Sequence, residues 1–532
     1  MKRSSDGGSM QAVLSEMWGQ AQRLEAEGAW DRAGRVYEDM LAKEPHHVPA
    51  QLRMSRLAQF GDRYCAAREH ALRAADAVRL KASTRNAGYV TGRLLEFAEE
   101  AEVASVILSA DWSDPNILQQ SAVLAQHLWL AGRYEDALRF LDAVARHVPA
   151  HPLLSFTRGN VLRFLGDMAG AEQAYEAALA LSPGLADAHW ALATHSRARV
   201  PMQRVPRIRQ ALSRSPAGGV EQAHLLYALF HEMDAAGEVD EAWQALEQGA
   251  AIMRRRLAYD ASAEAAYLQA LMRLPVPAAA EAVAAQALAS SERPQPVFIV
   301  GMPRSGTTLL DRILGNHGWV DSLGERNDFQ MALSQASDHF FHRTPASLER
   351  VAQVDARTAG HLFQQRMRLL APGRPCVLDK NPQNLFNIPL ILRALPHARI
   401  LCLRRDPMDA CFSNLKELFQ GDAYAYSYGL DDLAAHSGHA QQWMQHWQDA
   451  APHAVRVVDY EALVADPETV AAQLIEFIGL PAQAGLSDIT RNDAPVSTAS
   501  SSQVREGIHG RSLGAWKRYE QQLQPLRERM GG

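Results

Sequence analysis

Eight residues, GMPRSGTT (Gly301–Thr308), carry the strongest chemical signal in the sequence. They directly follow the apolar run VFIV and precede the helix-forming run LLDRILGNH. A strand, a glycine-containing loop and a helix start together aim several backbone N–H groups and a helix N-terminus at one anion. The segment therefore predicts a phosphate-binding loop. Its expected contacts with the anion come from Arg304, Ser305, Gly306, Thr307 and Thr308.

The loop differs from that of a nucleotide triphosphatase in the position of its positive charge. Gly301 and Gly306 keep the spacing of a P-loop, but Thr307 stands where a triphosphatase has lysine. Without that lysine a γ-phosphate loses its main counter-charge, which disfavours metal-assisted phosphoryl transfer. The charge lies instead on Arg304, whose guanidinium can reach an oxygen that bridges a phosphate to its neighbour. This pattern suits a monovalent sulfonate that leaves a phosphate without magnesium.

The segment PVFIVGMPRSGTTLL resembles the 5′-phosphosulfate loop of sulfotransferases that use 3′-phosphoadenosine 5′-phosphosulfate (PAPS). It is most similar to the loop of protein-tyrosine sulfotransferases and of bacterial proteins in which tetratricopeptide repeats precede a sulfotransferase domain. The resemblance covers about residues 294 to 520, and the repeats extend it over most of the chain. It implies an enzyme that binds PAPS, transfers its sulfonate to an acceptor hydroxyl without a metal, and releases the nucleotide PAP.

A second part of the donor site is expected after the predicted strand Arg399–Leu403. An Asp-Pro pair opens the following helix, because Asp caps and Pro suits the first turn. Arg405 then lies at the carboxyl end of a strand, where open α/β sheets bind ligands, and Ser413 lies about two turns into the helix. In the family an Arg and Ser pair at this spacing holds the 3′-phosphate. Protein-tyrosine sulfotransferases add a second arginine, which corresponds to Glu417, and the adjacent Lys416 could compensate.

The C-terminal segment from Ser500 also resembles a donor-binding loop of the family. There a Gln-Val pair precedes a tryptophan, and Gln503 and Trp516 fit that frame. Ser500 matches a serine that the family places near the transferring sulfonate. The family's lysine before the tryptophan is Ala515 here, so its contact with the 3′-phosphate must pass to another basic residue. The candidates are Arg505, Arg511 and Lys517, of which Lys517 is favoured.

A hydroxyl that attacks sulfur needs a base for its proton and a positive group at the leaving oxygen. By resemblance, Glu325 in the segment LGE matches the catalytic glutamate of protein-tyrosine sulfotransferases. Lys380 follows the predicted strand Cys376–Leu378 and matches a strand-end lysine that, with Arg304, would stabilise the developing charge. Tyr460 follows another predicted strand and lies near the nucleotide in the family, although a packing role is equally open.

Histidine is the base in cytosolic sulfotransferases, but here His317 is interpreted as the end of the helix after the loop. The pairs His339/His342 and His436/His439 have metal-like spacing without an obvious third ligand, so we expect surface or packing roles for them. Four scattered cysteines predict neither a disulfide framework nor a zinc site.

The first half of the chain contains a repeat of helical period. Gly132 and Gly166 lie 34 residues apart and are followed at equal offsets by small residues and then proline. The copy near the start is without error: Gly28, Ala33, Tyr37, Leu41 and Pro45. This pattern is similar to the tetratricopeptide repeat, a helix–turn–helix unit whose neighbours must stack into a solenoid. A weaker copy begins at Gly237, copies at Gly61 and around Ala98 are degenerate, and residues 199–219 are expected to be an irregular connection.

Strands that alternate with helices after residue 293 predict a parallel sheet covered on both faces. We therefore expect two regions, a tetratricopeptide-repeat solenoid over residues 10–292 and an α/β, P-loop-like sulfotransferase domain over residues 293–532. The net charge of −6 indicates no nucleic-acid or membrane surface. No stretch approaches the ~20 apolar residues that span a bilayer, and the N-terminus lacks a signal-peptide pattern, so we expect a cytoplasmic protein.

The acceptor stays open at this stage. A solenoid suggests a peptide, protein or other long substrate, and self-association of the repeats is equally open. Saccharide, lipid and small-molecule hydroxyls are further alternatives. Two other functions remain as rivals: a P-loop kinase or NTPase of the same fold, and a non-catalytic scaffold.

Overall fold

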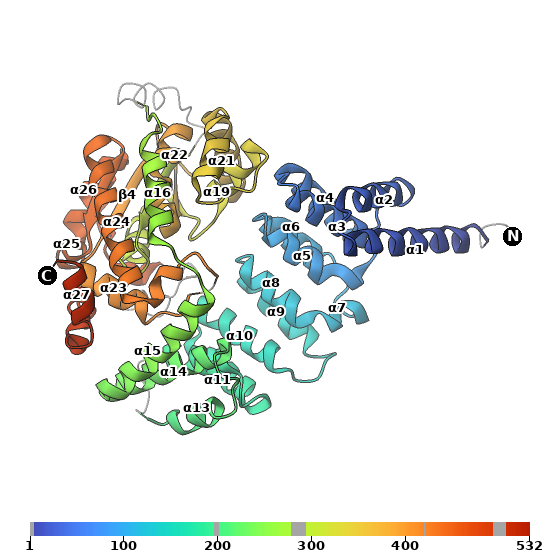
Figure 1. Ribbon diagram of the computed structural model, residues 1–532. Coiled ribbons are helices and arrows are strands. Elements are labelled where there is room, and N and C mark those ends of the chain that lie inside the picture. Colours follow the sequence, from blue (N-terminus) through green and yellow to red (C-terminus); the bar gives the residue numbers. More distant parts are fainter. Residues whose placement is uncertain (1–4, 196–201, 278–293, 420, 493–506, 532) are drawn as a thin grey trace. The chain divides into compact units, whose positions relative to one another are not determined.

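The structure is a computed structural model that describes residues 5–195, 202–277, 294–419, 421–492 and 507–531 (Figure 1). The chain divides into two compact units. The first comprises Met1–Val161 with Leu333–His342, and the second comprises Leu162–Ala332 with Arg343–Gly532. The boundary expected near residue 293 lies outside the described residues.

Helices fill the first unit. They are α1 (Ser5–Ala26), α2 (Trp30–Lys43), α3 (Val48–Phe60), α4 (Tyr64–Arg79), η1 (Thr84–Asn86), α5 (Ala87–Leu95), α6 (Glu100–Leu108), α7 (Pro115–Gln119), α8 (Ser121–Leu130) and α9 (Tyr134–Val144). Helix α10 (Pro152–Leu165) leads into the second unit. There the helical region continues as α11 (Met168–Leu181), α12 (Ala186–His195), α13 (Val205–Leu212), α14 (Val220–Ala236), α15 (Val239–Arg256) and α16 (Ala261–Met272).

Left-handed residues separate the helices of each repeat. Gly28, Gly132, Gly166 and Gly237 have φ values of 74°, 71°, 94° and 83°, a region that glycine enters without the strain a Cβ would cause. In the two degenerate copies a non-glycine residue takes this conformation, because Asp62 has a φ of 55° and Ala98 a φ of 52°. The turn geometry thus persists where the glycine signal is lost.

The helix that follows each turn buries small and aromatic side chains. Ala33, Ala137 and Ala171 are fully buried, as are Tyr37 and Tyr175. Small residues let neighbouring helices approach closely, and the rings fill the space one turn further on. The expected irregular connection at 199–219 is wrong in part, because Val205–Leu212 forms helix α13 with Val205 and Ile208 buried.

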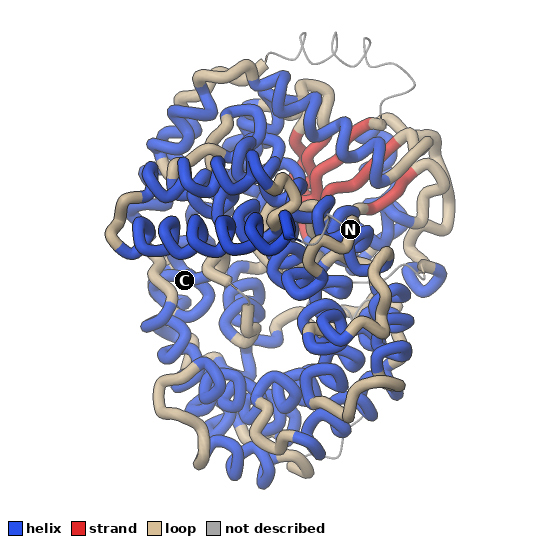
Figure 2. Tube along the Cα trace, turned by 90° about the vertical axis from the view of Figure 1, so that its right-hand side faces the viewer, coloured by secondary structure: helices blue, strands red, loops and turns tan. Residues whose placement is uncertain are grey.

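Five parallel strands form the sheet of the second unit in the order β2-β3-β1-β4-β5 (Figure 2). The strands are β1 (Gln295–Gly301), β2 (Val320–Ser322), β3 (Cys376–Lys380), β4 (Arg399–Arg404) and β5 (Val455–Asp459). The predicted helical region followed by a parallel α/β region is confirmed. Edge strand β2 was not predicted, because three residues with one buried side chain carry little apolar signal.

The other described helices of this part of the chain lie between the strands or after them in sequence. They are α18 (Thr307–Gly315), α19 (Asp328–Ser337), α20 (Pro345–Ala352), α21 (Ala356–Leu370), η2 (Pro382–Asn387), α22 (Ile388–Ala394), α23 (Pro407–Leu415), η3 (Ala425–Tyr428), α24 (Leu430–Ala450), α25 (Tyr460–Ala465), α26 (Pro467–Ile478), η4 (Ile489–Arg491), η5 (Ala515–Tyr519) and α27 (Gln524–Arg529).

Alternate residues of β1 supply both faces of the core. Val297 and Ile299 pack in one cluster with Leu310 of α18 and Leu474 of α26. Phe298 points the other way, and its ring lies 5.8 Å from Phe329 of α19 and 5.3 Å from Phe363 of α21. Burial on both faces explains why β1 is a continuous apolar run rather than an alternating one.

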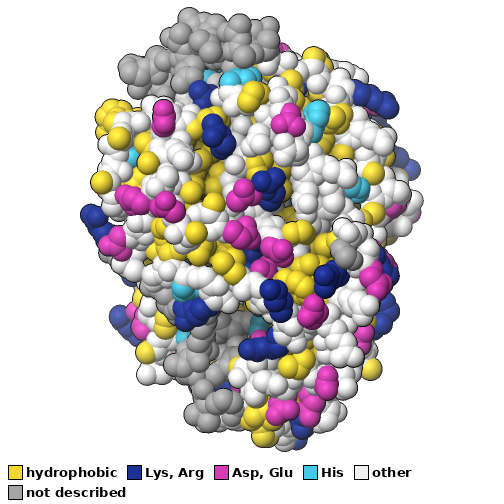
Figure 3. All heavy atoms as spheres, turned by 90° about the vertical axis from the view of Figure 1, so that its left-hand side faces the viewer, with side chains coloured by type: hydrophobic (Ala, Val, Ile, Leu, Met, Phe, Trp, Pro, Cys, Tyr) yellow, Lys and Arg dark blue, Asp and Glu magenta, His cyan; other side chains and the backbone are white. Residues whose placement is uncertain are grey.

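Charges of both signs are mixed on the surface. Figure 3 shows basic and acidic side chains interspersed over one face, in keeping with the small net charge of −6. In the described part of the chain, none of the helices is long and apolar enough to cross a membrane.

Candidate functional site

The loop predicted to bind phosphate connects β1 to α18, the strand-to-helix context that the motif predicts. Its two glycines are required by close contacts as well as by positive φ. A Cβ at Gly301 would lie 2.6 Å from the carbonyl oxygen of Leu403 on the neighbouring strand β4, and Gly301 has a φ of 147°. A Cβ at Gly306 would lie 2.3 Å from the ring of Tyr460, and Gly306 has a φ of 103°. The loop is therefore wedged against β4 and α25.

Helix α18 begins directly after the loop, so its first backbone N–H groups face outward from its N-terminus. Thr307 and Thr308 are its first two residues and are buried, and the Ser305 hydroxyl donates to the Met302 carbonyl oxygen over 2.7 Å. The predicted loop residues thus form one compact turn. Asn414 of α23 supports it by donating a hydrogen bond of 2.8 Å to the Pro303 carbonyl.

Arg304 is the strained residue of the loop, with a φ of 66° that a non-glycine residue seldom adopts. This conformation turns its side chain toward α23. Its Nε donates to the Ser413 hydroxyl over 3.4 Å and lies 4.0 Å from a carboxylate oxygen of Glu417. Its carbonyl oxygen accepts a 3.0 Å hydrogen bond from Arg405. The structure therefore brings together three of the residues predicted for donor binding, Arg304, Arg405 and Ser413.

Arg405 lies at the end of β4 with only 6% of its side chain exposed. One guanidinium nitrogen donates to the Ser512 carbonyl over 2.5 Å, and the Tyr460 ring centroid lies 4.8 Å from the guanidinium carbon. The carboxylate of Asp409, one helical turn further on, is 3.8 Å away. Within the described residues, the buried Nε of Arg405 has no hydrogen-bond partner. A buried cationic donor without a partner fits an anionic ligand, since leaving it unpaired is costly.

Tyr460 contacts the loop, Arg405 and the C-terminal segment. Its ring contacts Gly306 of the loop and covers Arg405, and its hydroxyl lies 3.1 Å from the Ser512 hydroxyl. The ring therefore has the packing role, and its place near the nucleotide stays a prediction.

The C-terminal segment is anchored by a residue that the sequence did not point to. Asp409 of α23 is buried and accepts hydrogen bonds from the backbone N–H groups of Gly514 at 2.7 Å and Trp516 at 3.4 Å. Lys517 and Arg511 are exposed. The predicted donor residues Ser500, Gln503 and Arg505 lie outside the described residues.

Glu325 and Lys380 form an ion pair on the other side of the loop. Lys380 is the last residue of β3, and its Nζ donates to Glu325 Oε1 over 2.5 Å. The lysine side chain is 1% exposed, whereas the glutamate is 34% exposed. The sequence did not predict that Glu325 and Lys380 form a pair, because they lie 55 residues apart in the chain. The accessible carboxylate and the buried ammonium suit a proton acceptor and a fixed positive charge, respectively.

Asp311 and Ser322 support the turn that carries Glu325, and neither was singled out by the sequence. The Ser322 hydroxyl donates to Asp311 Oδ1 of α18 over 2.5 Å and accepts from the Gly324 N–H over 3.2 Å. Burial raises the pKa of Asp311, and the nearby Lys380 ammonium opposes that shift. Beside the lysine, Asp379 is buried and its pKa is raised well above the usual range by burial.

The carboxyl ends of β3, β1 and β4 bring these groups to one edge of the sheet. Lys380 pairs in register with Ile299, two residues before the loop, and Gly301 pairs with Leu403, two residues before Arg405. In parallel sheets this edge is where ligands bind. Lys380, the loop and Arg405 thus lie at the ends of three adjacent strands, and Glu325, which follows the neighbouring strand β2, is joined to them through Lys380.

Three of the histidines considered in the sequence analysis make hydrogen bonds to protein groups. His317 follows α18, its Nε2 lies 2.9 Å from the Pro481 carbonyl, and its Nδ1 accepts from the Trp319 N–H. His436 and His439 both bond the carboxylate of Glu264. Among the described residues, no group of three or more His, Cys, Asp or Glu side chains is arranged to hold a metal ion.

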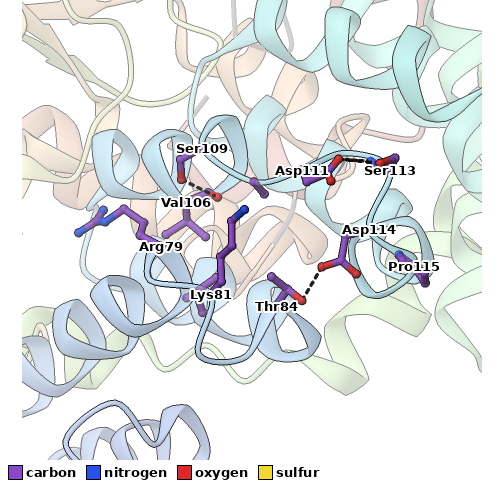
Figure 4. Close-up of a pocket in the computed structure, with 11 residues that line it drawn as sticks. Arg79, Lys81, Thr84, Val106, Ser109, Asp111, Ser113, Asp114 and Pro115 are labelled. Atoms are coloured by element: carbon purple, nitrogen blue, oxygen red, sulfur yellow. Dashed lines mark hydrogen bonds between the residues drawn. The ribbon is translucent and has the colours of Figure 1, made fainter.

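A separate cavity of ≈360 Å³ lies in the first unit (Figure 4). Arg79 and Lys81 line it from the end of α4, and Asp111 and Asp114 line it from the turn before α7. Thr84 donates a 2.8 Å hydrogen bond to Asp114 at its edge. The sequence predicted none of these residues to take part in chemistry.

The region that carries the sheet matches a known family. Residues 296–484 match the model of the Sulfotransferase family. An uncharacterized protein from Aquifex aeolicus (strain VF5) is 25% identical over 438 residues, which are 81% of this chain and 56% of the relative. The chain thus spans about half the length of that relative.

Two solved structures are similar at lower levels of identity. The sulfotransferase domain of the olefin synthase from Synechococcus PCC 7002 is 20% identical with a TM-score of 0.30, and the match covers 42% of this chain and 88% of that one. The C-terminal part of a TPR repeat-containing protein from Cytophaga hutchinsonii is 15% identical with a TM-score of 0.32, over 44% of this chain and 95% of that one. By the family match, the loop and the sheet belong to a region of sulfotransferase type.

Proposed function

We propose that the protein transfers the sulfonate of PAPS to an acceptor hydroxyl. The observation that carries the proposal is the arrangement at the carboxyl edge of β3, β1 and β4. There the phosphate-binding loop lies between an accessible carboxylate paired with a buried ammonium and a buried arginine whose Nε lacks a partner among the described residues. The match of residues 296–484 to the Sulfotransferase family supports the same reaction.

In the proposed complex, the loop residues 301–308 hold the 5′-phosphosulfate, and Arg405 with Ser413 hold the 3′-phosphate. Backbone N–H groups at the start of α18 and the hydroxyls of Thr307 and Thr308 suit the phosphosulfate. The planar, buried guanidinium of Arg405 suits a phosphate, which can accept two parallel hydrogen bonds. Ser500, Gln503, Arg505 and Lys517 remain proposed contributors, of which Lys517 is described and exposed.

Glu325 would take the proton of the acceptor hydroxyl while its oxygen forms a bond to sulfur. The bond between sulfur and the bridging oxygen breaks, and the electron pair stays on the 5′-phosphate of PAP. Lys380 and Arg304 would stabilise that oxygen. Because the Lys380 ammonium lies beside Glu325, it also stabilises the charged carboxylate that accepts the proton.

We further propose that residues 10–292 are tetratricopeptide repeats and that residues 293–532 are the PAPS-dependent domain. The 34-residue spacing of Gly132 and Gly166 and their matching left-handed turns support the repeats. Repeats of this kind bind extended peptides along one face, so a peptide or protein acceptor is the favoured substrate class.

The test separates binding from chemistry. Wild-type protein should bind adenosine 3′,5′-bisphosphate in calorimetry with EDTA present, and it should bind ATP much more weakly. Glu325→Gln should lower sulfonate transfer from labelled PAPS by about 10²–10⁴-fold, the usual contribution of a general base, while changing the bisphosphate affinity little.

The matched control is Glu476→Gln, an exposed glutamate of α26, which should leave both quantities unchanged. Tight binding of ATP with no binding of the bisphosphate would contradict the proposal, and full turnover by Glu325→Gln would remove Glu325 from the mechanism.

A further inference from the structure

Glu417 places a carboxylate beside the residues proposed to hold the 3′-phosphate. It lies two residues after the end of α23, where its backbone N–H donates to the Asn414 carbonyl over 3.0 Å. Its carboxylate oxygen lies 4.0 Å from Arg304 Nε, and the same nitrogen bonds Ser413. The two side chains are shielded, since 10% of Arg304 and 14% of Glu417 is exposed. The Arg304 guanidinium therefore contacts both the Glu417 carboxylate and Ser413, the serine expected to contact phosphate.

The charges around Glu417 come from several elements. Arg304 of the loop, Arg163 of α10 and the adjacent Lys416 are the cations that act on it, and the phenols of Tyr227 and Tyr428 also lie near it. Burial nevertheless raises the pKa of Glu417 above its usual value. Burial also lowers the pKa of Lys416 to about 8, and the guanidinium groups of Arg304 and Arg405 add to that shift.

A 3′-phosphate bound to Arg405 and Ser413 would come close to this carboxylate, because Arg304 Nε lies 3.4 Å from the Ser413 hydroxyl and 4.0 Å from Glu417. Two anions in a shielded space repel strongly, and the usual outcome is that one of them becomes neutral. A phosphate held by arginines keeps its charge, whereas a buried carboxyl group binds a proton more readily. The site is thus built so that a 3′-phosphate and an ionised Glu417 exclude each other.

We propose that Glu417 pairs with Arg304 before nucleotide binds, and that a nucleotide whose 3′-phosphate binds Arg405 and Ser413 releases Arg304 toward the bridging oxygen while Glu417 accepts a proton from solvent. The inference rests on the proposed function, because it concerns the same donor site. It makes Glu417 a positioning and specificity residue, since it opposes a 3′-phosphate when ionised. Donor binding then involves uptake of one proton, and the affinity weakens as the pH rises.

Isothermal titration calorimetry of the full chain with adenosine 3′,5′-bisphosphate tests this from about pH 5.5 to about pH 8.5. Proton uptake by one group changes affinity by at most about tenfold per pH unit. We expect Glu417→Gln to bind the bisphosphate about tenfold or more tightly than wild type at the high end, with the ratio falling toward one at the low end. The 3′-phosphate titrates in this range too, but it does so equally in both proteins.

Three controls make the result specific. Adenosine 5′-monophosphate lacks the 3′-phosphate, so wild type and Glu417→Gln should bind it with the same affinity at each pH. Glu476→Gln changes the net charge equally at an exposed site and should behave as wild type. Glu417→Met removes the carboxyl group altogether, and it should match Glu417→Gln if the carboxylate is responsible.

The outcomes that overturn the inference are distinct from those that overturn the proposed function. The role of Glu417 is refuted if the ratio of affinities between wild type and Glu417→Gln is constant across the pH range, or if Glu417→Gln binds more weakly. Either result leaves the proposed function intact. Failure of every variant to bind the bisphosphate at any pH refutes the proposed function and, with it, this inference.

Discussion

At the residue scale, the proposed function makes single charged side chains at the carboxyl ends of the strands responsible for the choice of anion. Arg405 is held flat between the Tyr460 ring and backbone carbonyls of the loop and the C-terminal segment. A planar guanidinium can keep these contacts and still face a phosphate, whereas a lysine carries a point charge on a flexible stem. Arg405 is therefore the position at which a conservative change is most informative.

We expect Arg405→Lys to weaken binding of adenosine 3′,5′-bisphosphate by about 10–100-fold, because charge-assisted hydrogen bonds contribute ~1.5–3 kcal/mol each. Calorimetry with adenosine 5′-monophosphate should show a much smaller loss of affinity, because this nucleotide lacks the 3′-phosphate. Arg404→Lys is the matched control, since its side chain is 41% exposed and pairs with Asp459. Equal losses for both nucleotides would place Arg405 away from the 3′-phosphate.

The sequence pointed to single residues of this candidate site, but it did not predict which of them contact one another. Arg405 and Ser413 follow from spacing on one strand and helix, and the structure brings them to Arg304. The approach of Glu417 to Arg304 joins residues that are far apart in the chain and depends on the order of β1 and β4 in the sheet. Spacing in a sequence cannot encode such an approach. The anchoring role of Asp409 was missed for the same reason.

At the scale of elements, the sequence predicted strands and turns correctly where apolar runs and glycines mark them clearly. The apolar run VFIV and the three other predicted strands, at Cys376–Leu378, at Arg399–Leu403 and before Tyr460, are β1, β3, β4 and β5. Strand β2 is too short to show an apolar period. The glycine turns of the repeats adopt a left-handed conformation. Asp62 and Ala98 adopt it too, which a glycine pattern cannot predict, because there packing of the flanking helices overrides the local preference.

Gly237 allows a clean test of these turns. It has a φ of 83°, and a Cβ there would meet nothing within 4 Å, so Gly237→Ala adds conformational strain without a clash. We expect the free energy of unfolding to fall by about 1–2 kcal/mol, the cost of a left-handed alanine. Gly184→Ala is the control, since that Cβ also has open space and Gly184 lacks a positive φ. Urea unfolding measures both, and equal stabilities would contradict the strain argument.

At the scale of the whole molecule, the two compact units do not coincide with the change in sequence pattern. Helices α11 to α16 belong to the same unit as the sheet. Tyr227 of α14 donates a 3.0 Å hydrogen bond to the Leu415 carbonyl at the end of α23, and Asp234 of α14 accepts from Tyr519 of η5. Glu264 of α16 bonds two histidines of α24. Sequence patterns showed helical repeats but not which of them pack against the sheet.

The contact of Glu264 with α24 predicts a pH-dependent part of the stability. Burial alone would raise the pKa of Glu264, but hydrogen bonds from His436, His439 and Tyr259 outweigh it and hold the pKa below its usual value. A lowered folded pKa means that the carboxylate stabilises the fold above the unfolded pKa of about 4.3 and loses this effect as the pH falls through the folded value.

We therefore expect Glu264→Gln to lower the free energy of unfolding by about 1–3 kcal/mol near neutral pH, as for loss of charge-assisted hydrogen bonds. The difference from wild type should shrink as the pH drops below about 4.3. Urea unfolding at a series of pH values measures it, with Glu476→Gln as the control. A difference that stays constant in acid would show that the carboxylate charge is not responsible.

The hydrogen bond from Tyr227 to Leu415 has a practical consequence for producing the part of the chain that carries the sheet as a recombinant fragment. Cutting the chain where its amino-acid pattern changes would strip α14 and α16 from α23 and α24 and leave Leu415 and His436 without their covering side chains. A fragment that starts near Leu162 keeps those side chains in place. Truncation experiments should therefore begin with the longer fragment, because insolubility of the shorter one would say nothing about catalysis.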